Sequence, residues 1–192
     1  QYLMAQQDWV HLAGNHERQV LHLHAKSGAS DSYAHSQLSS TEFEWMASLP
    51  FVRPLNDDVL LCHGTPTSDI TYLLQTADQS ATPAEIATRL GPVTESLVLC
   101  GHTHVPRSVR SGVTLIVNPG SVGHPAYADT YPRPHVVETG SPDARYAIVE
   151  KRNGDWVADL ISVPYACREM AELARLRNRP DWVCALLTGY MA

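Results

Sequence analysis

The chain has 192 residues, of which 44% are hydrophobic and 18% are charged, a composition typical of one globular domain with a sizeable core. Its 14 Lys and Arg residues against 20 Asp and Glu residues give a formal charge of -6, without a basic run. This balance argues against generic binding to nucleic acid or to an anionic membrane surface.

The cysteines and the hydropathy pattern predict a cytoplasmic protein. Cys62 and Cys100 lie within apolar runs, and no pair of cysteines shows Cys-x-x-Cys spacing. We therefore interpret them, together with Cys167 and Cys184, as buried thiols in a reducing compartment. No segment approaches the roughly 18 apolar residues of a membrane span, and we find no secretion signal.

Three apolar stretches are predicted to be β-strands, and a short polar run follows each of them. The strands are expected at residues 9–13, 59–62 and 97–100, and the polar runs are Gly14-Asn15-His16-Glu17, His63-Gly64 and Gly101-His102-Thr103-His104. Open α/β folds place their ligands at the carboxyl ends of strands. We therefore expect side chains from distant parts of the chain to meet at one sheet edge.

Capping signals predict the helices of the first half. Residues 18–25 are expected to be helical, and residues 26–36 are expected to form a polar loop. Ser39 and Glu42 form a capping box that begins the next helix, with Met46 on its apolar face. A further helix is expected from Thr82-Pro83 to Gly91, because Pro favours the first helical position and Gly ends helices.

The second half begins with a strand at residues 114–117, which ends at the run Asn118-Pro119-Gly120-Ser121-Val122-Gly123. A long loop is expected from there to about Asp143, as a rim over the site. Residues 145–163 form the strongest hairpin signal, with the turn at Asn153-Gly154. Two amphipathic helices are predicted within about residues 164–189.

The residue types in the polar runs point to metal chemistry. Imidazoles and a carboxamide oxygen suit a borderline divalent ion such as Mn, Fe, Ni or Zn. Asn15, His63 and His102 are candidate ligands of one ion. If residues 102–104 are extended, His104 points away from His102 and suits an adjacent ion. Two ions about 3.5 to 4 Å apart clamp the attacking and leaving oxygens of a phosphoryl group.

These motifs resemble those of the calcineurin-like metallophosphoesterases, and Asn118-Pro119-Gly120-Ser121-Val122-Gly123 is similar to the small bacterial and archaeal phosphodiesterase branch. The resemblance implies two divalent ions, with Mn favoured over Fe, Ni or Zn. Asn15, His63 and His102 would bind the second ion, and His104 would bind the first. His16 would stabilise the phosphoryl oxygens or protonate the leaving group, while a metal-bridging hydroxide attacks phosphorus.

The resemblance also predicts the fold, an α/β protein with a two-sheet β-sandwich flanked by helices, in one domain over residues 1–192. Family members begin with a strand carrying Asp-x-His, followed by a Gly-Asp whose carboxylate bridges the metals. Only Asp8 and His11 are available before Gly14. We therefore expect a domain that is incomplete at its N-terminus and lacks its first βαβ portion. One interpretation is that this chain is inactive by itself.

Several alternatives stay open. We favour a small phosphodiester as substrate, but a phosphomonoesterase or a dinucleoside polyphosphate hydrolase fits the same motifs. A metal-poor scaffold or protein-interaction module is the alternative from another class, because the superfamily includes a retromer subunit. Retention of His16 argues against it, since a scaffold needs no substrate-facing histidine.

Other charged residues have weaker assignments. Arg107 and Arg133 are candidate phosphate contacts, because a guanidinium binds phosphate oxygens in bidentate fashion. Glu17 is expected to cap a helix rather than to bind metal. His22 and His24 are interpreted as surface residues. His124 and His135 could contact substrate, but we favour the interpretation that they are solvated loop residues. Asn118 is expected to pack beneath the metal site.

Overall fold

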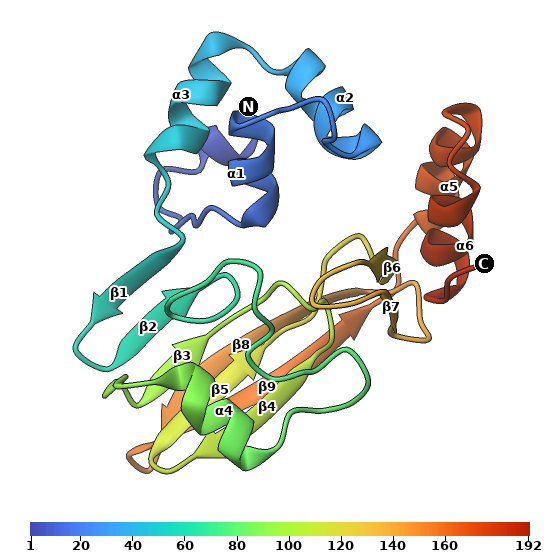
Figure 1. Cartoon of the computed structure of the whole chain (residues 1–192). Helices are drawn as coiled ribbons and strands as arrows, with labels where there is room; N and C mark the ends of the chain where they lie inside the picture. The colour runs from blue at the N-terminus through green and yellow to red at the C-terminus, as the bar shows by residue number, and fades with distance from the viewer.

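A five-stranded sheet forms the centre of the computed structural model, which describes all 192 residues (Figure 1). The strand order is β1-β2-β3-β5-β4, with β2, β3 and β5 parallel and the two edge strands antiparallel to their neighbours. The strands are β1 (Val52–Asn56), β2 (Val59–Cys62), β3 (Leu97–Leu99), β4 (Arg107–Ser111) and β5 (Thr114–Asn118). Parallel strands are covered on both faces, so continuous apolar runs such as β5 predict them well.

A β-hairpin forms the second layer behind the central sheet. Its strands β8 (Ala144–Arg152) and β9 (Asp155–Val163) are antiparallel, and Asn153-Gly154 makes the turn with φ angles of 53° and 92°. Side chains of the hairpin pack on one face of the sheet. This cluster contains Val59, Leu97, Leu115 and Val117 from the sheet, with Ala147, Val149, Trp156 and Ala158 from the hairpin.

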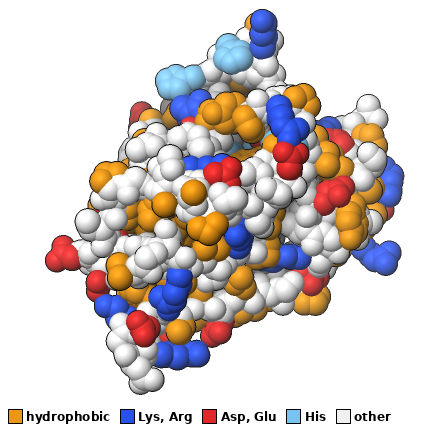
Figure 2. All heavy atoms as spheres, turned by 60° about the horizontal axis from the view of Figure 1, so that its bottom comes forward, with side chains coloured by type: hydrophobic (Ala, Val, Ile, Leu, Met, Phe, Trp, Pro, Cys, Tyr) orange, Lys and Arg blue, Asp and Glu red, His pale blue; other side chains and the backbone are white.

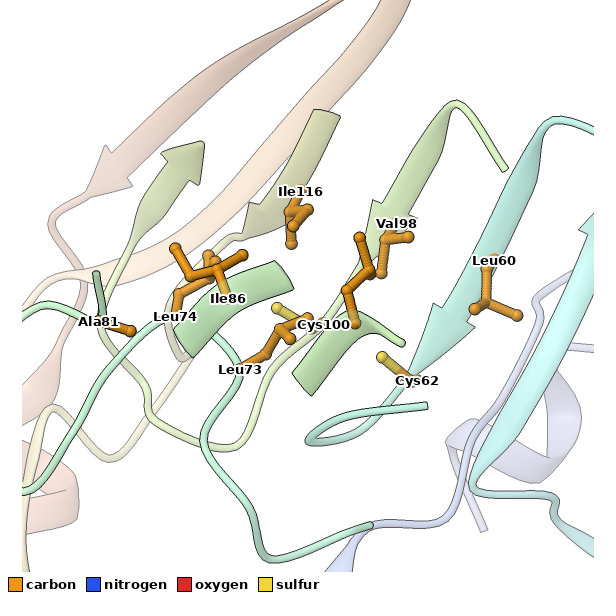
Figure 3. Packing of buried hydrophobic residues seen from close by; sticks show 10 residues of the cluster. Leu60, Cys62, Leu73, Leu74, Ala81, Ile86, Val98, Cys100 and Ile116 are labelled. Atoms are coloured by element: carbon orange, nitrogen blue, oxygen red, sulfur yellow. The ribbon is translucent and has the colours of Figure 1, made fainter. Parts of the chain in front are cut away.

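Helix α4 (Pro83–Leu90) covers the opposite face of the sheet (Figure 1). Ile86 from α4 packs with Val98 and Ile116 in the larger core cluster, and Leu73 and Leu74 complete the layer (Figure 3). The predicted capping box of α4 is present, with Thr82 and Glu85 bonded reciprocally. The predicted two-sheet sandwich with external helices is therefore confirmed.

Three helices of the N-terminal segment lie beyond the end of the sheet: α1 (Asn15–Leu21), α2 (Ala29–Gln37) and α3 (Ser40–Ser48), after the 3-10 turn η1 (Leu3–Ala5) (Figure 1). The capping box of α3 is confirmed. The strand predicted at residues 9–13 is wrong, because this run has no ladder partner and Ala13 N–H donates only to Pro50 O, at 2.9 Å. The loop predicted at residues 26–36 is also wrong, since α2 forms there against α1.

The long loop predicted to about Asp143 contains a small hairpin instead. Its strands are β6 (Ala126–Asp129) and β7 (His135–Glu138). The prolines of this region, which suggested a loop, lie outside the two strands and therefore cost no ladder hydrogen bond. Edge strands β1 and β4 were not predicted either, because β1 is short, largely exposed and contains Pro54, and β4 is largely polar.

Two C-terminal helices complete the fold as predicted: α5 (Cys167–Leu176) and α6 (Pro180–Thr188), which ends at Gly189 in the left-handed conformation. Arg179 at the start of α6 reaches α2, where its Nη1 donates to Ser30 Oγ at 2.9 Å. None of the helices combines the length and apolar composition needed to cross a bilayer.

The distribution of charge on the surface and the state of the cysteines can be compared with what the sequence predicts. Figure 2 shows basic and acidic side chains interspersed on one face, without a basic tract. All four cysteines are free. Cys62 and Cys100 are buried in the sheet, as predicted, whereas Cys167 and Cys184 are only partly buried, because they belong to the outer helical pair.

Candidate metal centre and active site

The predicted ligands meet where strands β2 and β3 end and helix α1 begins. His63 directly follows β2, His102 lies in the turn after β3, and Asn15 is the first residue of α1. His63 Nε2 lies 3.0 Å from Asn15 Oδ1, and the rings of His63 and His102 are 5.1 Å apart between centroids. Three side chains from distant parts of the chain therefore form one group.

This group fits one borderline divalent ion. Two ligand atoms about 2.1 Å from an ion, in adjacent octahedral positions, lie about 3 Å apart. In the structure this 3.0 Å contact is a hydrogen bond in which His63 Nε2 donates to Asn15 Oδ1, at a length close to that spacing. An ion bound to both atoms would displace this proton to His63 Nδ1. No group of three or more His, Cys, Asp or Glu side chains is placed to hold an ion. The candidate donors are instead two imidazoles, from His63 and His102, and the carboxamide of Asn15. Three such donors would leave coordination positions for water or substrate.

Backbone carbonyls fix the tautomers of the two histidines after β3. His102 Nε2 lies 3.1 Å from Ile70 O, and His104 Nδ1 lies 2.7 Å from His124 O. A carbonyl oxygen only accepts, so these nitrogens carry the protons. The lone pairs then belong to His102 Nδ1 and His104 Nε2, as in metal-binding histidines whose other nitrogen donates to an outer partner.

Burial keeps these imidazoles neutral. It lowers the pKa of His63 to about 4, and repulsion from neighbouring His102 adds to that shift. Burial also lowers the pKa of His102 and the pKa of His104. Neutral imidazole is the form that binds a metal ion.

The backbone of the His-Thr-His turn is strained. His102 and His104 have φ angles of 67° and 60°, in the left-handed region that costs a non-Gly residue about 1 to 3 kcal/mol. The segment is therefore not extended, and the argument that separated the two histidines by strand alternation is wrong. Buried Asn118 holds the turn, as its Nδ2 donates to Gly101 O at 2.7 Å and to Thr103 Oγ1 at 2.9 Å. The position expected for Asn118, beneath the site, is confirmed.

His16 lies beside this group, with its side chain 68% exposed. Its Nδ1 is 2.8 Å from Oδ1 of Asp31, a carboxylate on α2 whose side chain is only 12% exposed. The carboxylate accepts from Nδ1, which leaves Nε2 facing outward for proton transfer. Glu17 Oε2 accepts from Gly14 N at 2.6 Å, so the expected capping role of Glu17 is confirmed.

Sequence reasoning missed Asp31 because a polar run without apolar periodicity predicted a loop. It also missed the aromatic groups behind the histidines. Tyr72 OH lies within 3.2 Å of the Tyr127 hydroxyl, the Asp129 carboxylate and His135 Nε2, and Tyr127 OH donates to His102 O at 3.4 Å. Burial raises the pKa of Tyr72 to about 12, so this hydroxyl stays protonated.

The prediction that His124 and His135 are solvated loop residues is wrong. The His124 ring lies 4.4 Å from the ring of Trp182 on α6, and His135 bonds to Tyr72. Both are held because the β6–β7 hairpin folds onto the site. His22 and His24 are exposed, as expected.

The two candidate phosphate contacts have other partners. Arg107 donates to the carbonyls of Leu74 and Ala81, at the border between the sheet and the segment before α4. Arg133 pairs with exposed Asp78. Neither guanidinium contacts a histidine of the site, so the structure does not bring them to the metal centre.

Gly14 is required by close packing against His63. A Cβ at residue 14 would lie 2.6 Å from His63 Cε1, although the φ of -101° would accept any side chain. We expect Gly14→Ala to displace the ring and to weaken Mn(II) binding about 10- to 100-fold, as loss of an outer partner does. Isothermal titration calorimetry checks this, with Gly123→Ala as the control, because a Cβ there meets open space. Equal Mn(II) affinity in both variants would contradict the packing argument.

A sandwich with imidazole and carboxamide donors at its strand ends, beside a carboxylate-paired histidine, is compatible with metal-dependent hydrolysis. The chain belongs to the calcineurin-like phosphoesterase superfamily, whose domain model matches residues 3–140. Membership places it among the metal-dependent phosphoesterases, hydrolases that act on phosphoester bonds.

Solved structures share the fold. A metallophosphoesterase from Sphaerobacter thermophilus is 20% identical, with a TM-score of 0.72 over 96% of this chain and 78% of its own. A hypothetical protein from Pyrococcus horikoshii OT3 is 16% identical, with a TM-score of 0.72 over 100% of this chain and 77% of its own. At these identities the likeness shows the fold. No curated protein sequence matches the chain significantly.

Proposed function

We propose that the protein hydrolyses small phosphodiesters in a reaction that depends on divalent metal, with Mn(II) the favoured ion and the cytoplasm the expected compartment. The observation that carries this proposal is the convergence of Asn15, His63 and His102 next to the His16–Asp31 pair. The similarity of residues 118–123 to the small phosphodiesterase branch favours diesters over monoesters.

The metal ligands that we propose combine the family resemblance with the geometry of these side chains. One ion would be held by Asn15 Oδ1, His102 Nδ1 and His63 Nε2, the last after its proton moves to Nδ1, and His104 Nε2 is available to an adjacent ion. A bound ion polarises the phosphoryl group and supplies the positive charge that the acidic chain lacks. The carbonyls of Ile70 and His124 orient two of the imidazoles.

His16 acts on the leaving group in this scheme. Its outward Nε2 donates a proton to the departing ester oxygen, while the Asp31 carboxylate holds Nδ1 and stabilises the charged ring. Proton donation matters most when the leaving group is a poor one, so leaving-group dependence reports on this pair.

We expect Asp31→Asn to lower kcat with little change in KM, because the amide retains an acceptor for Nδ1 but not the charge. The loss should be about 10- to 100-fold on diphenyl phosphate and smaller on bis-p-nitrophenyl phosphate, since outer partners typically contribute that much. Steady-state kinetics on both esters measures it, with Asp78→Asn, an exposed carboxylate, as the control. An equal loss of kcat on the two esters would show that Asp31 does not support proton donation to the leaving group.

The substrate class is tested by comparing bis-p-nitrophenyl phosphate with p-nitrophenyl phosphate and a dinucleoside polyphosphate in the presence of Mn(II). Higher kcat/KM for the diester supports the proposal. A preference for either other substrate would replace it with the monoesterase or polyphosphate hydrolase alternative. A folded protein that binds no metal and cleaves none of them would favour the scaffold alternative.

A further inference from the structure

Arg18 lies on the same helix as one of the candidate metal donors, Asn15. It lies three residues after Asn15 in α1, so the two side chains share one face of the helix. Its Nε and Nη2 donate to the Asp69 carboxylate at 2.6 and 3.0 Å. Asp69 is largely buried, with its side chain 16% exposed.

Asp69 lies near His63 and His102. Burial lowers the pKa of both rings, and the charge of Asp69 partly offsets this lowering. The turn that contains Asp69 folds back on Gly64, where a Cβ would lie 2.7 Å from the carbonyl oxygens of Ser68 and Thr71. The following residue, Ile70, provides the carbonyl that holds His102 Nε2 at 3.1 Å. The guanidinium of Arg18 is therefore tied to the same short turn that orients a metal ligand.

One edge of this guanidinium is free. Asp69 takes the edge formed by Nε and Nη2, while Nη1 makes no hydrogen bond and the side chain is 48% exposed. The other candidate cations are engaged elsewhere, Arg107 with carbonyls and Arg179 with Asp181 and Ser30. Among these arginines, Arg18 alone combines an unused donor edge with a carboxylate partner in the turn that holds His102.

We propose that Arg18 is a substrate-contact residue whose Nη1 edge binds a non-bridging oxygen of the phosphoryl group, and that Asp69 is the positioning residue that aims it. The inference rests on the proposed function and adds a binding group to it. A guanidinium presents paired donors to phosphate oxygens, and a carboxylate on its other edge removes the freedom that binding would otherwise cost. The phosphoryl group is an anion, whereas the chain carries a net charge of -6. A cation next to the metal site would therefore favour substrate binding.

The test compares wild type with Arg18→Gln, Arg18→Lys and the control Arg152→Gln, an exposed arginine paired with Glu150 and Asp159. Isothermal titration calorimetry measures inorganic phosphate binding to the Mn(II)-treated protein, and kinetics on bis-p-nitrophenyl phosphate separates KM from kcat. We expect Arg18→Gln to weaken phosphate binding about tenfold to hundredfold, the loss expected for a charge-assisted hydrogen bond. The phosphate affinity of Arg18→Lys should lie between those of wild type and Arg18→Gln, since lysine keeps the charge but lacks the paired donors of a guanidinium.

Phosphate affinity and KM in Arg18→Gln equal to those of Arg152→Gln would overturn the proposal for Arg18. If Arg18→Gln melts at a lower temperature than wild type, the phosphate affinity of Arg18→Lys is the deciding measurement, because this variant retains a cation that can pair with Asp69. The two proposals fail separately. If the wild-type protein hydrolyses the diester and Arg18→Gln behaves like wild type, the proposed contact is wrong and the proposed function stands. If phosphate binding depends on Arg18 but no diester is hydrolysed, the contact stands and the proposed function is wrong.

Discussion

Replacement of His16 by Ala is expected to lower kcat for diester hydrolysis by about 10²- to 10⁴-fold, the usual contribution of a positioned general acid. The ring is exposed and its Nδ1 is held by Asp31, so the substitution removes the proton donor without opening the core. Mn(II) affinity should stay unchanged, because His16 is not among the ligands. Steady-state kinetics and calorimetry on the same samples measure the two quantities.

His22→Ala is the matched control, since it removes an exposed histidine just after the same helix. The loss in His16→Ala should be larger on diphenyl phosphate than on bis-p-nitrophenyl phosphate, whose leaving group departs without a proton. Retention of most of the activity on both esters would exclude His16 as the proton donor.

Replacement of His102 by Ala is expected to weaken Mn(II) binding by more than the roughly 10- to 100-fold that loss of an outer partner causes, and to abolish hydrolysis. His102 provides one of the imidazoles in a group of only three donors. Calorimetric titration with Mn(II) gives the affinity, and thermal melting gives the stability.

His102→Gly separates ligand loss from damage to the fold. The backbone of His102 has φ of 67°, which glycine adopts without a steric penalty, so this variant relieves strain while removing the same imidazole. We expect it to melt at or above the temperature of His102→Ala and to bind Mn(II) equally poorly. Wild-type Mn(II) affinity in either variant would show that His102 is no ligand.

The strand-end histidines could be located from sequence because their positions depend on local patterns. Strands β2 and β3 are continuous apolar runs buried on both faces, and His63 and His102 follow them within three residues. The capping boxes of α3 and α4 are local in the same sense, since each needs only residues three apart.

The rest of the site depends on contacts between distant segments, which local patterns do not encode. Helix α2, which carries Asp31, has few apolar residues, and Arg179 bonds to its Ser30 across 149 positions of sequence. The left-handed turn at His102 needs Asn118 beneath it, so spacing alone suggested an extended segment. Propensity is a weak guide wherever tertiary contacts of this kind decide the local structure.

The most direct test of the account is the Mn(II) dependence of bis-p-nitrophenyl phosphate hydrolysis by this chain after removal of metal with a chelator. The account predicts no hydrolysis in the metal-free protein and a rate that rises with Mn(II) and saturates as the group of Asn15, His63 and His102 fills. A rate that does not respond to Mn(II), in a protein shown to be folded and to bind the ion, would contradict it. A complete lack of hydrolysis in that protein would favour the interpretation that this chain is inactive by itself.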